Sequence, residues 1–186
     1  MPPQNDLLAT AERVAALLAE NGVPALVIGA IALAAHRYIR FTQDIDLGVD
    51  ADLGVMRNCT LALSKAGYQA VLHEPDADDP LGGVIDITGS FGLVQIISFA
   101  DRFPDAINDS FASSQLSLYP GSPLRLIPIP QLVALKLYAG GHKAKADIIE
   151  MLKRNPEQDR AEITRTIKRY RLRGLNQIWQ ELDQNA

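Results

Sequence analysis

Long apolar runs are absent from the sequence: none approaches the roughly 18 residues of a membrane-spanning helix, which excludes a transmembrane segment. Cysteine is almost absent too, and the single Cys59 cannot form an internal disulfide. The first residues, MPPQNDLLAT, lack the basic and apolar regions of a signal peptide. We therefore expect a cytoplasmic protein that has no membrane partner.

The patterns of several enzyme classes are also missing. Cysteine and histidine residues at zinc-site spacing do not occur, and no Ser-His-Asp pattern or internal repeat is visible. What is present is an ordinary globular composition, with 47% hydrophobic and 22% charged residues in a chain of 186 residues. This length and composition predict one compact unit that buries a sizeable core.

The charges are divided unevenly along the chain. Residues 1–110 carry 6 basic and 15 acidic side chains, a net charge of −9, whereas residues 111–186 carry 12 basic and 7 acidic ones, a net charge of +5. Much of this basic excess lies in residues 153–173, which hold eight basic and three acidic side chains. Two interpretations stay open: a solvated helix face, favoured because no aromatic residues interleave the charges, and a face that binds RNA.

The first part of the sequence alternates helical and strand-like patterns. Apolar residues at helical spacing predict a helix that ends near residue 22, where Asn-Gly and a proline follow. Residues 24–29 and 44–50 have the character of strands, whereas residues 30–38 and 51–67 have that of helices. The predicted order is helix, strand, helix, strand, helix.

Further strands and a helical end are expected downstream. Strands are predicted over residues 68–74, 84–88 and 93–99, with an acidic loop after the first and a hairpin joining the other two. A short helix within 102–111 and edge strands over 115–119 and 124–129 precede three or four helices that begin at Pro130. The predicted fold class is α+β: a mixed sheet flanked by helices over residues 1–128, with a helical part over 129–186 packed on it.

Two aspartates lie within one predicted strand. Asp44 and Asp46 flank Ile45, so in an extended strand both carboxylates project from one face. Ionised carboxylates are costly to bury unless they are paired or bound to a cation, and Mg²⁺ commonly takes one or two carboxylates plus water and substrate phosphates. The pair indicates either a Mg²⁺ site for phosphoryl or nucleotidyl transfer or a surface or helix-capping pair.

The surrounding segment, IGAIALAAHRYIRFTQDIDL, is similar to the signature of the nucleotidyltransferase superfamily, which has the DNA polymerase β type of fold. In that signature a Gly-Gly or Gly-Ser pair leads a helix, and R-x-T-x-D-x-D follows. The matching residues here are Gly29, Ala30, Arg40, Thr42, Asp44 and Asp46. The resemblance implies that the two aspartates are catalytic metal ligands and that the other four residues bind the nucleotide, the first two through backbone N–H groups.

The segment LVALKLYAGGHKAKADIIEML, residues 132–152, resembles the helical motif of abortive-infection (AbiEii-like) nucleotidyltransferase toxins. In that motif a lysine-bearing helix precedes a K-x-x-x-D helix, and the corresponding residues are Lys136, Lys143 and Asp147. Lys136 interrupts an apolar run, so its ammonium group must reach water or a negative partner. The resemblance implies that these residues take part in triphosphate binding and that the protein is the toxin of a toxin–antitoxin pair.

A third carboxylate, which the superfamily carries on a later strand, is missing from the matching position. The segment LVQII places Gln95 there, and its amide can coordinate through oxygen but cannot act as a general base. Asp86 lies on the neighbouring strand of the predicted hairpin. Two alternatives stay open: Asp86 substitutes as the catalytic carboxylate, or Gln95 fills the nucleotide site and catalysis is impaired.

The expected function is Mg²⁺-dependent binding of a nucleoside triphosphate and transfer of its nucleotidyl group to a hydroxyl acceptor. The acceptor stays open among an RNA end, a protein side chain and a small molecule, and an antitoxin is an expected partner. The alternative is a nucleotidyltransferase fold without catalytic activity, which serves as a nucleotide- or partner-binding module.

Overall fold

The computed structural model describes residues 6–75 and 82–184. The strands are β1 (Leu26–Ile28), β2 (Asp44–Val49), β3 (Gln69–His73), β4 (Val84–Gly89), β5 (Gly92–Ser98) and β6 (Arg125–Leu126). The helices are α1 (Asp6–Glu20), α2 (Gly29–Ala35), α3 (Leu53–Lys65), α4 (Pro104–Ser113), α5 (Ile129–Ala139), α6 (Gly141–Arg154), α7 (Arg160–Arg169) and α8 (Leu175–Gln184). The predicted order of elements up to α4 is confirmed.

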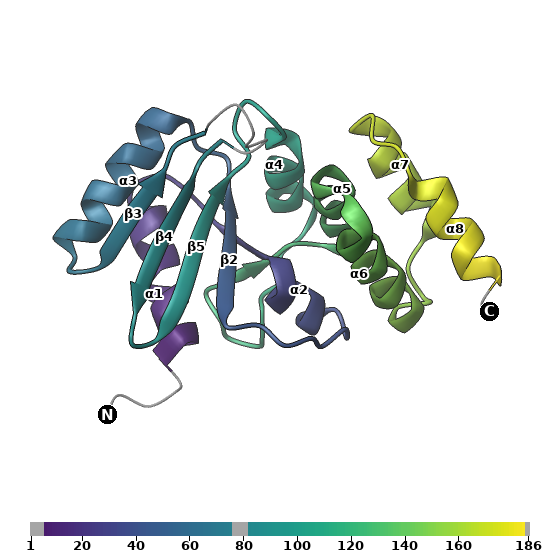
Figure 1. Cartoon of the computed structure of the whole chain (residues 1–186), viewed down its shortest axis with the longest axis horizontal. Helices are drawn as coiled ribbons and strands as arrows, with labels where there is room; N and C mark the ends of the chain where they lie inside the picture. The colour runs from purple at the N-terminus through teal and green to yellow at the C-terminus, as the bar shows by residue number, and fades with distance from the viewer. Residues whose placement is uncertain (1–5, 76–81, 185–186) are drawn as a thin grey trace.

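Within the described ranges, six strands form one mixed sheet in the order β3-β4-β5-β2-β1-β6 (Figure 1). Strand β2 runs parallel to β5 and β1 runs parallel to β6, whereas the other neighbouring strands are antiparallel. Helices α5 to α8 gather beside α2 at one end of the molecule, away from β3 and β4 (Figure 1). The predicted α+β class, a mixed sheet flanked by helices, is confirmed.

The alternation of side chains along the central strands decides which face of the sheet is buried. Ile45 and Leu47 of β2 and Val94 and Ile96 of β5 are at most 2% exposed, and α1 packs on both strands. The residues between them along each strand point to the opposite face, because side chains alternate in a strand. This opposite face carries the polar side chains of the candidate site.

One predicted edge strand does not form. Residues 115–119 make only an isolated bridge, between Ser117 and Arg125, and β6 is two residues long where 124–129 was expected. Pro120, Pro123 and Pro128 border these segments, and proline lacks the N–H that a continued ladder requires. The predicted acidic loop lies partly in residues 76–81, outside the described residues.

The helical end begins where it was predicted. Pro130 stands in the first turn of α5, and four helices follow β6 in the described part of the chain. Gly140 lies between α5 and α6 with φ +71°, and Gly141, the first residue of α6, has φ +81°; both values favour glycine. No helix among the described residues is long and apolar enough to cross a membrane. The division at residue 128 stays a prediction.

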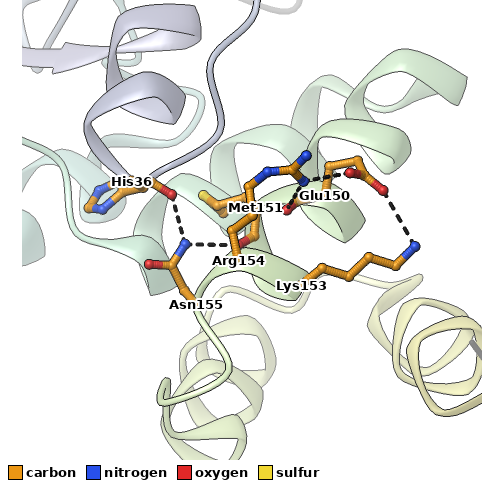
Figure 2. A network of polar contacts seen from close by, with 6 residues as sticks. All are labelled: His36, Glu150, Met151, Lys153, Arg154 and Asn155. Carbon is orange, nitrogen blue, oxygen red and sulfur yellow. Dashed lines mark hydrogen bonds and ion pairs between the residues drawn. The ribbon is translucent and has the colours of Figure 1, made fainter. Parts of the chain in front are cut away.

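A polar network fixes the end of α6 against the end of α2 (Figure 2). Asn155 Nδ2 donates to the carbonyl oxygens of His36 at 2.7 Å and Met151 at 2.8 Å. Glu150 accepts from Lys153 and Arg154 on the exposed side of the same helix. Because α2 and α6 both carry candidate site residues, this contact sets their relative position.

Candidate active site

The aspartate pair lies at the start of β2, on the face opposite the buried one. Asp44 and Asp46 are half-buried, while Ile45 between them is 2% exposed. The hydroxyl of Thr42 donates to Asp44 Oδ1. The two carboxylates therefore share one face, as their spacing predicts.

The first residue of α2 lies against the second aspartate. Ile28 is opposite Asp46 in the antiparallel pairing of β1 and β2, so the chain enters α2 beside that carboxylate. Gly29 has φ +65°, and a methyl group on its Cα would lie 1.8 Å from Asp46 Oδ2. Ala30, the next residue, is 3% exposed. Only glycine leaves room for the Asp46 carboxylate at this position.

Gly29→Ala is therefore expected to displace the Asp46 carboxylate and to lower Mg²⁺-dependent triphosphate affinity at least tenfold, measured by calorimetry. Gly22→Ala, just after the end of α1, is the matched control, because Gly22 has φ +76° but a methyl group on its Cα would meet no described atom within 4 Å. Both variants carry the backbone strain of about 1 kcal/mol, and only the first has the clash. Equal triphosphate affinities for the two variants would contradict the close approach.

Two cations of the site are held by one buried carboxylate. Lys136 Nζ of α5 donates to Asp147 Oδ2 at 2.7 Å, and Arg40 Nε lies 3.6 Å from Asp147 Oδ1. The Asp147 side chain is 4% exposed, against 13% for Lys136 and 27% for Arg40. Lys143, one turn before Asp147 on α6, is exposed. Asp147 thus contacts the two cations directly, and its role in nucleotide binding stays a prediction.

The charges of these residues act on one carboxyl group. Burial, followed by the charge of Asp44, raises the pKa of Asp46 from 3.8 to about 6. Lys136, Arg40 and Lys143 act in the opposite direction and lower the same pKa. Residues from β2, α5, α6 and the loop before β2 are therefore within electrostatic reach of one another.

A cavity of about 300 Å³ opens beside this cluster, between the sheet and α5. Asp46 and Lys136 contribute the charged groups of its wall. The rest of its lining is uncharged and mainly apolar, and consists of Ile28, Gly29, Ile97, Phe99, Leu132, Leu135, Tyr138, Ala139 and Ala144. The cavity offers an apolar compartment directly next to a carboxylate and an ammonium group.

A row of polar side chains continues from Asp46 across the sheet. Gln95 of β5 pairs with Asp46 of β2 on one side and with Asp86 of β4 on the other. Gln95 Nε2 donates to Asp86 Oδ1 at 2.7 Å, and His73 Nε2 lies 3.0 Å from Asp86 Oδ2. Gln95, not Asp86, is the lateral neighbour of Asp46.

His73 is the member of this row that the sequence did not identify. It lies on β3, and nothing in its own segment distinguishes it from a solvated strand residue. The signal that places it beside Asp86 is the antiparallel pairing of β3 with β4, which the sequence pattern does not specify.

The donor set fits Mg²⁺. Among residues 6–75 and 82–184 no group of three His, Cys, Asp or Glu side chains is arranged to hold a metal ion. Mg²⁺ needs fewer protein ligands, because it keeps several waters and binds through one or two carboxylates plus substrate phosphates. Asp44 and Asp46, on one face of β2, would supply two such carboxylates.

Known proteins resemble this chain in their structures but not in their sequences. No family model matches the sequence, and no curated protein does. The solved structure of the antibiotic-resistance factor ANT(2'')-Ia is similar over 91% of this chain and 93% of its own, with a TM-score of 0.58 and 16% identity. ANT(2'')-Ia in complex with adenylyl-2''-tobramycin matches 88% of this chain and 96% of its own, with a TM-score of 0.57 and 15% identity.

A larger protein shows the same arrangement in part of its chain. The Megavirus polyadenylate synthase matches 85% of this chain but 33% of its own length, with a TM-score of 0.52 and 13% identity. The chain therefore has the nucleotidyltransferase fold.

Proposed function

We propose that the protein is a Mg²⁺-dependent nucleotidyltransferase, which binds a nucleoside triphosphate and transfers its nucleotidyl group to a hydroxyl acceptor. The observation that carries this proposal is the placement of Asp46 against Gly29, with Asp44 on the same face and three cations acting on its charge. A pair of aspartates with a purely structural role would not require a glycine and three cations from other parts of the chain to lie around one carboxylate.

The roles of the residues follow from their contacts. Asp44 and Asp46 would hold the metal ion, which when bound neutralises charge on the phosphates. Lys136, Lys143 and Arg40 would neutralise the charge of the triphosphate. The backbone N–H groups of Gly29 and Ala30 would donate hydrogen bonds to phosphate oxygens. Thr42 orients Asp44 through its hydrogen bond.

Lys143→Gln is expected to raise the KM for the triphosphate about tenfold with no change in Tm, because an exposed lysine that contacts phosphate contributes to binding and not to folding. Lys145→Gln is the matched control: it removes the same charge two residues away, where the lysine pairs with Glu181 at 2.6 Å. Transfer from each of four α-labelled triphosphates to RNA, protein and tobramycin provides the assay. A wild type that binds no triphosphate in the presence of Mg²⁺ would refute the proposal.

The proposal has two versions, which differ in whether the acceptor is RNA or a small hydroxylated molecule. In the basic segment 153–173, all of which is described, five of the eight basic side chains form ion pairs with carboxylates. These are Lys153, Arg154, Arg160, Arg165 and Arg169. This pairing reduces the charge available to RNA, and the adenylyl-2''-tobramycin bound by ANT(2'')-Ia supports a small hydroxylated acceptor.

A toxin role extends the proposal through the resemblance to AbiEii-like proteins. It implies that expression in the cytoplasm arrests growth, that Lys143→Gln relieves the arrest more than Lys145→Gln, and that a cognate antitoxin suppresses it. Normal growth on expression of an active enzyme would restrict the proposal to nucleotidyl transfer without toxicity.

The second candidate is a catalytically silent nucleotide-binding module. The observation that favours it is the position of Gln95, an uncharged amide, directly beside Asp46 on β5. Triphosphate binding with no transfer to any acceptor would select this candidate.

A further inference from the structure

We propose that Gln95 supplies a neutral amide oxygen to the metal site of Asp44 and Asp46, and that Asp86 is the positioning residue that turns this oxygen toward the site. The inference rests on the proposed function, because it assigns a role at the same metal site. It extends the alternative in which Gln95 fills the site, because it gives Asp86 a role that acts through Gln95 and does not replace it.

The first step is the order of the residues across the sheet. Asp46, Gln95 and Asp86 pair in register on three neighbouring strands, so their side chains project from one face. Neighbouring strands lie about 4.8 Å apart. The backbone of Gln95 is therefore about 5 Å from that of Asp46, and the backbone of Asp86 is about 10 Å away, with Gln95 in between.

The second step is the orientation of the amide. An ionised carboxylate only accepts hydrogen bonds, so the 2.7 Å contact with Asp86 Oδ1 commits the NH₂ end of Gln95 to the β4 side. The amide oxygen is on the other branch of the planar group and is directed away from β4. Asp46 lies on that side in the strand register.

The third step concerns the hydrogen bonds that the Asp86 carboxylate already makes. One of its oxygens accepts from Gln95, and the other is 3.0 Å from His73 Nε2. Its side chain is 28% exposed, and that of His73 is 57% exposed. With both oxygens engaged along the β3–β4–β5 row, Asp86 is held away from Asp44 and Asp46. It can orient Gln95 but does not reach the metal site in this arrangement.

The charge of the ligand set follows from these contacts. Two carboxylates and one amide oxygen give the site one negative charge less than three carboxylates would. Hard cations such as Mg²⁺ and Mn²⁺ accept amide oxygens as ligands, so the site keeps its oxygen count and binds the cation with lower affinity.

The test uses Mn²⁺ binding to the full chain, measured by electron paramagnetic resonance with a non-hydrolysable triphosphate present. Gln95→Leu removes the amide oxygen and is expected to weaken Mn²⁺ binding about tenfold. Asp86→Leu releases the amide and should weaken binding to a similar extent. The double variant should be no weaker than either single variant, because both remove one interaction.

Asp86→Asn separates positioning from catalysis. An asparagine amide can accept from Gln95 Nε2 or donate to Gln95 Oε1, so Asp86→Asn should weaken Mn²⁺ binding, by less than Asp86→Leu does. Transfer should fall by no more than the loss of Mn²⁺ affinity explains. Glu74→Gln serves as the control, because Glu74 pairs with Arg57 at 2.8 Å on the exposed surface. Thermal melts of every variant verify that each is folded.

Two outcomes overturn the inference alone: unchanged Mn²⁺ affinity in Gln95→Leu while Asp44→Asn abolishes binding, or loss of transfer with normal Mn²⁺ affinity in Asp86→Asn. The second outcome would make Asp86 a general base. A wild type that binds neither Mn²⁺ nor triphosphate overturns the proposed function as well, so the two failures are distinguishable.

Discussion

The double variant Asp44→Asn, Asp46→Asn is expected to lose Mg²⁺-dependent triphosphate binding by more than a hundredfold and to remain folded. Both carboxylates project from one face of β2, and without a cation they repel each other. Calorimetry with a non-hydrolysable triphosphate measures the binding, and a thermal melt measures the stability. A much lower Tm together with unchanged triphosphate affinity would show that the pair is structural.

The pH dependence of this variant has a definite sign. Since the folded pKa of Asp46 is raised to about 6, the folded state binds a proton more readily than the unfolded state does. The stabilisation from this protonation is present below about pH 4 and is lost as the pH rises through about 6. Replacing Asp46, in this double variant or alone, should therefore raise Tm at pH 8 and have less effect at pH 4. The raised pKa accounts for an increase of no more than about 3 kcal/mol in the free energy of unfolding at pH 8.

A charge-matched control isolates the site from the loss of two negative charges. Asp101→Asn, Asp105→Asn removes the same charge from exposed positions near the start of α4. This control should retain triphosphate binding and show little of the Tm increase at pH 8. An equal increase in both variants would assign the effect to net charge.

Asp147→Asn is expected to lower the free energy of unfolding by about 2–4 kcal/mol and to weaken triphosphate binding. The change removes the buried partner of Lys136 and leaves two poorly exposed cations without their carboxylate. Urea denaturation measures the loss. Glu150→Gln on the same helix is the control, because its pairs with Lys153 and Arg154 are exposed and should contribute under about 1 kcal/mol.

A second substitution separates the stability effect from the functional one. Lys136→Met combined with Asp147→Asn removes the buried ammonium group, so most of the lost stability should return. Triphosphate binding should not return, because Lys136 is itself proposed to contact phosphate. If Asp147→Asn is as stable as Glu150→Gln, Asp147 does not anchor these cations.

Local features of the sequence were sufficient for most of the fold. The alternation in residues 44–49 predicted that Ile45 faces the core while both aspartates face the other side, and the structure has this arrangement. Pro130 predicted the start of α5 for a reason confined to its own ring, which fits the first turn of a helix. The predicted edge strand at 115–119 was wrong, because prolines border the segment and its partner strand β6 is only two residues long.

For the candidate site, too, the sequence predicted some features and only the structure could show the others. The sequence by itself determined that Asp44, Asp46, Arg40 and Thr42 are close, because one short segment carries them all. Only the tertiary structure decided that Gln95 is the neighbour of Asp46, that His73 joins Asp86, and that Asp147 holds Lys136 and Arg40. The physical reason is that backbone periodicity fixes which face a residue occupies, whereas the order of strands and the packing of α5 against α6 fix which residues meet across that face.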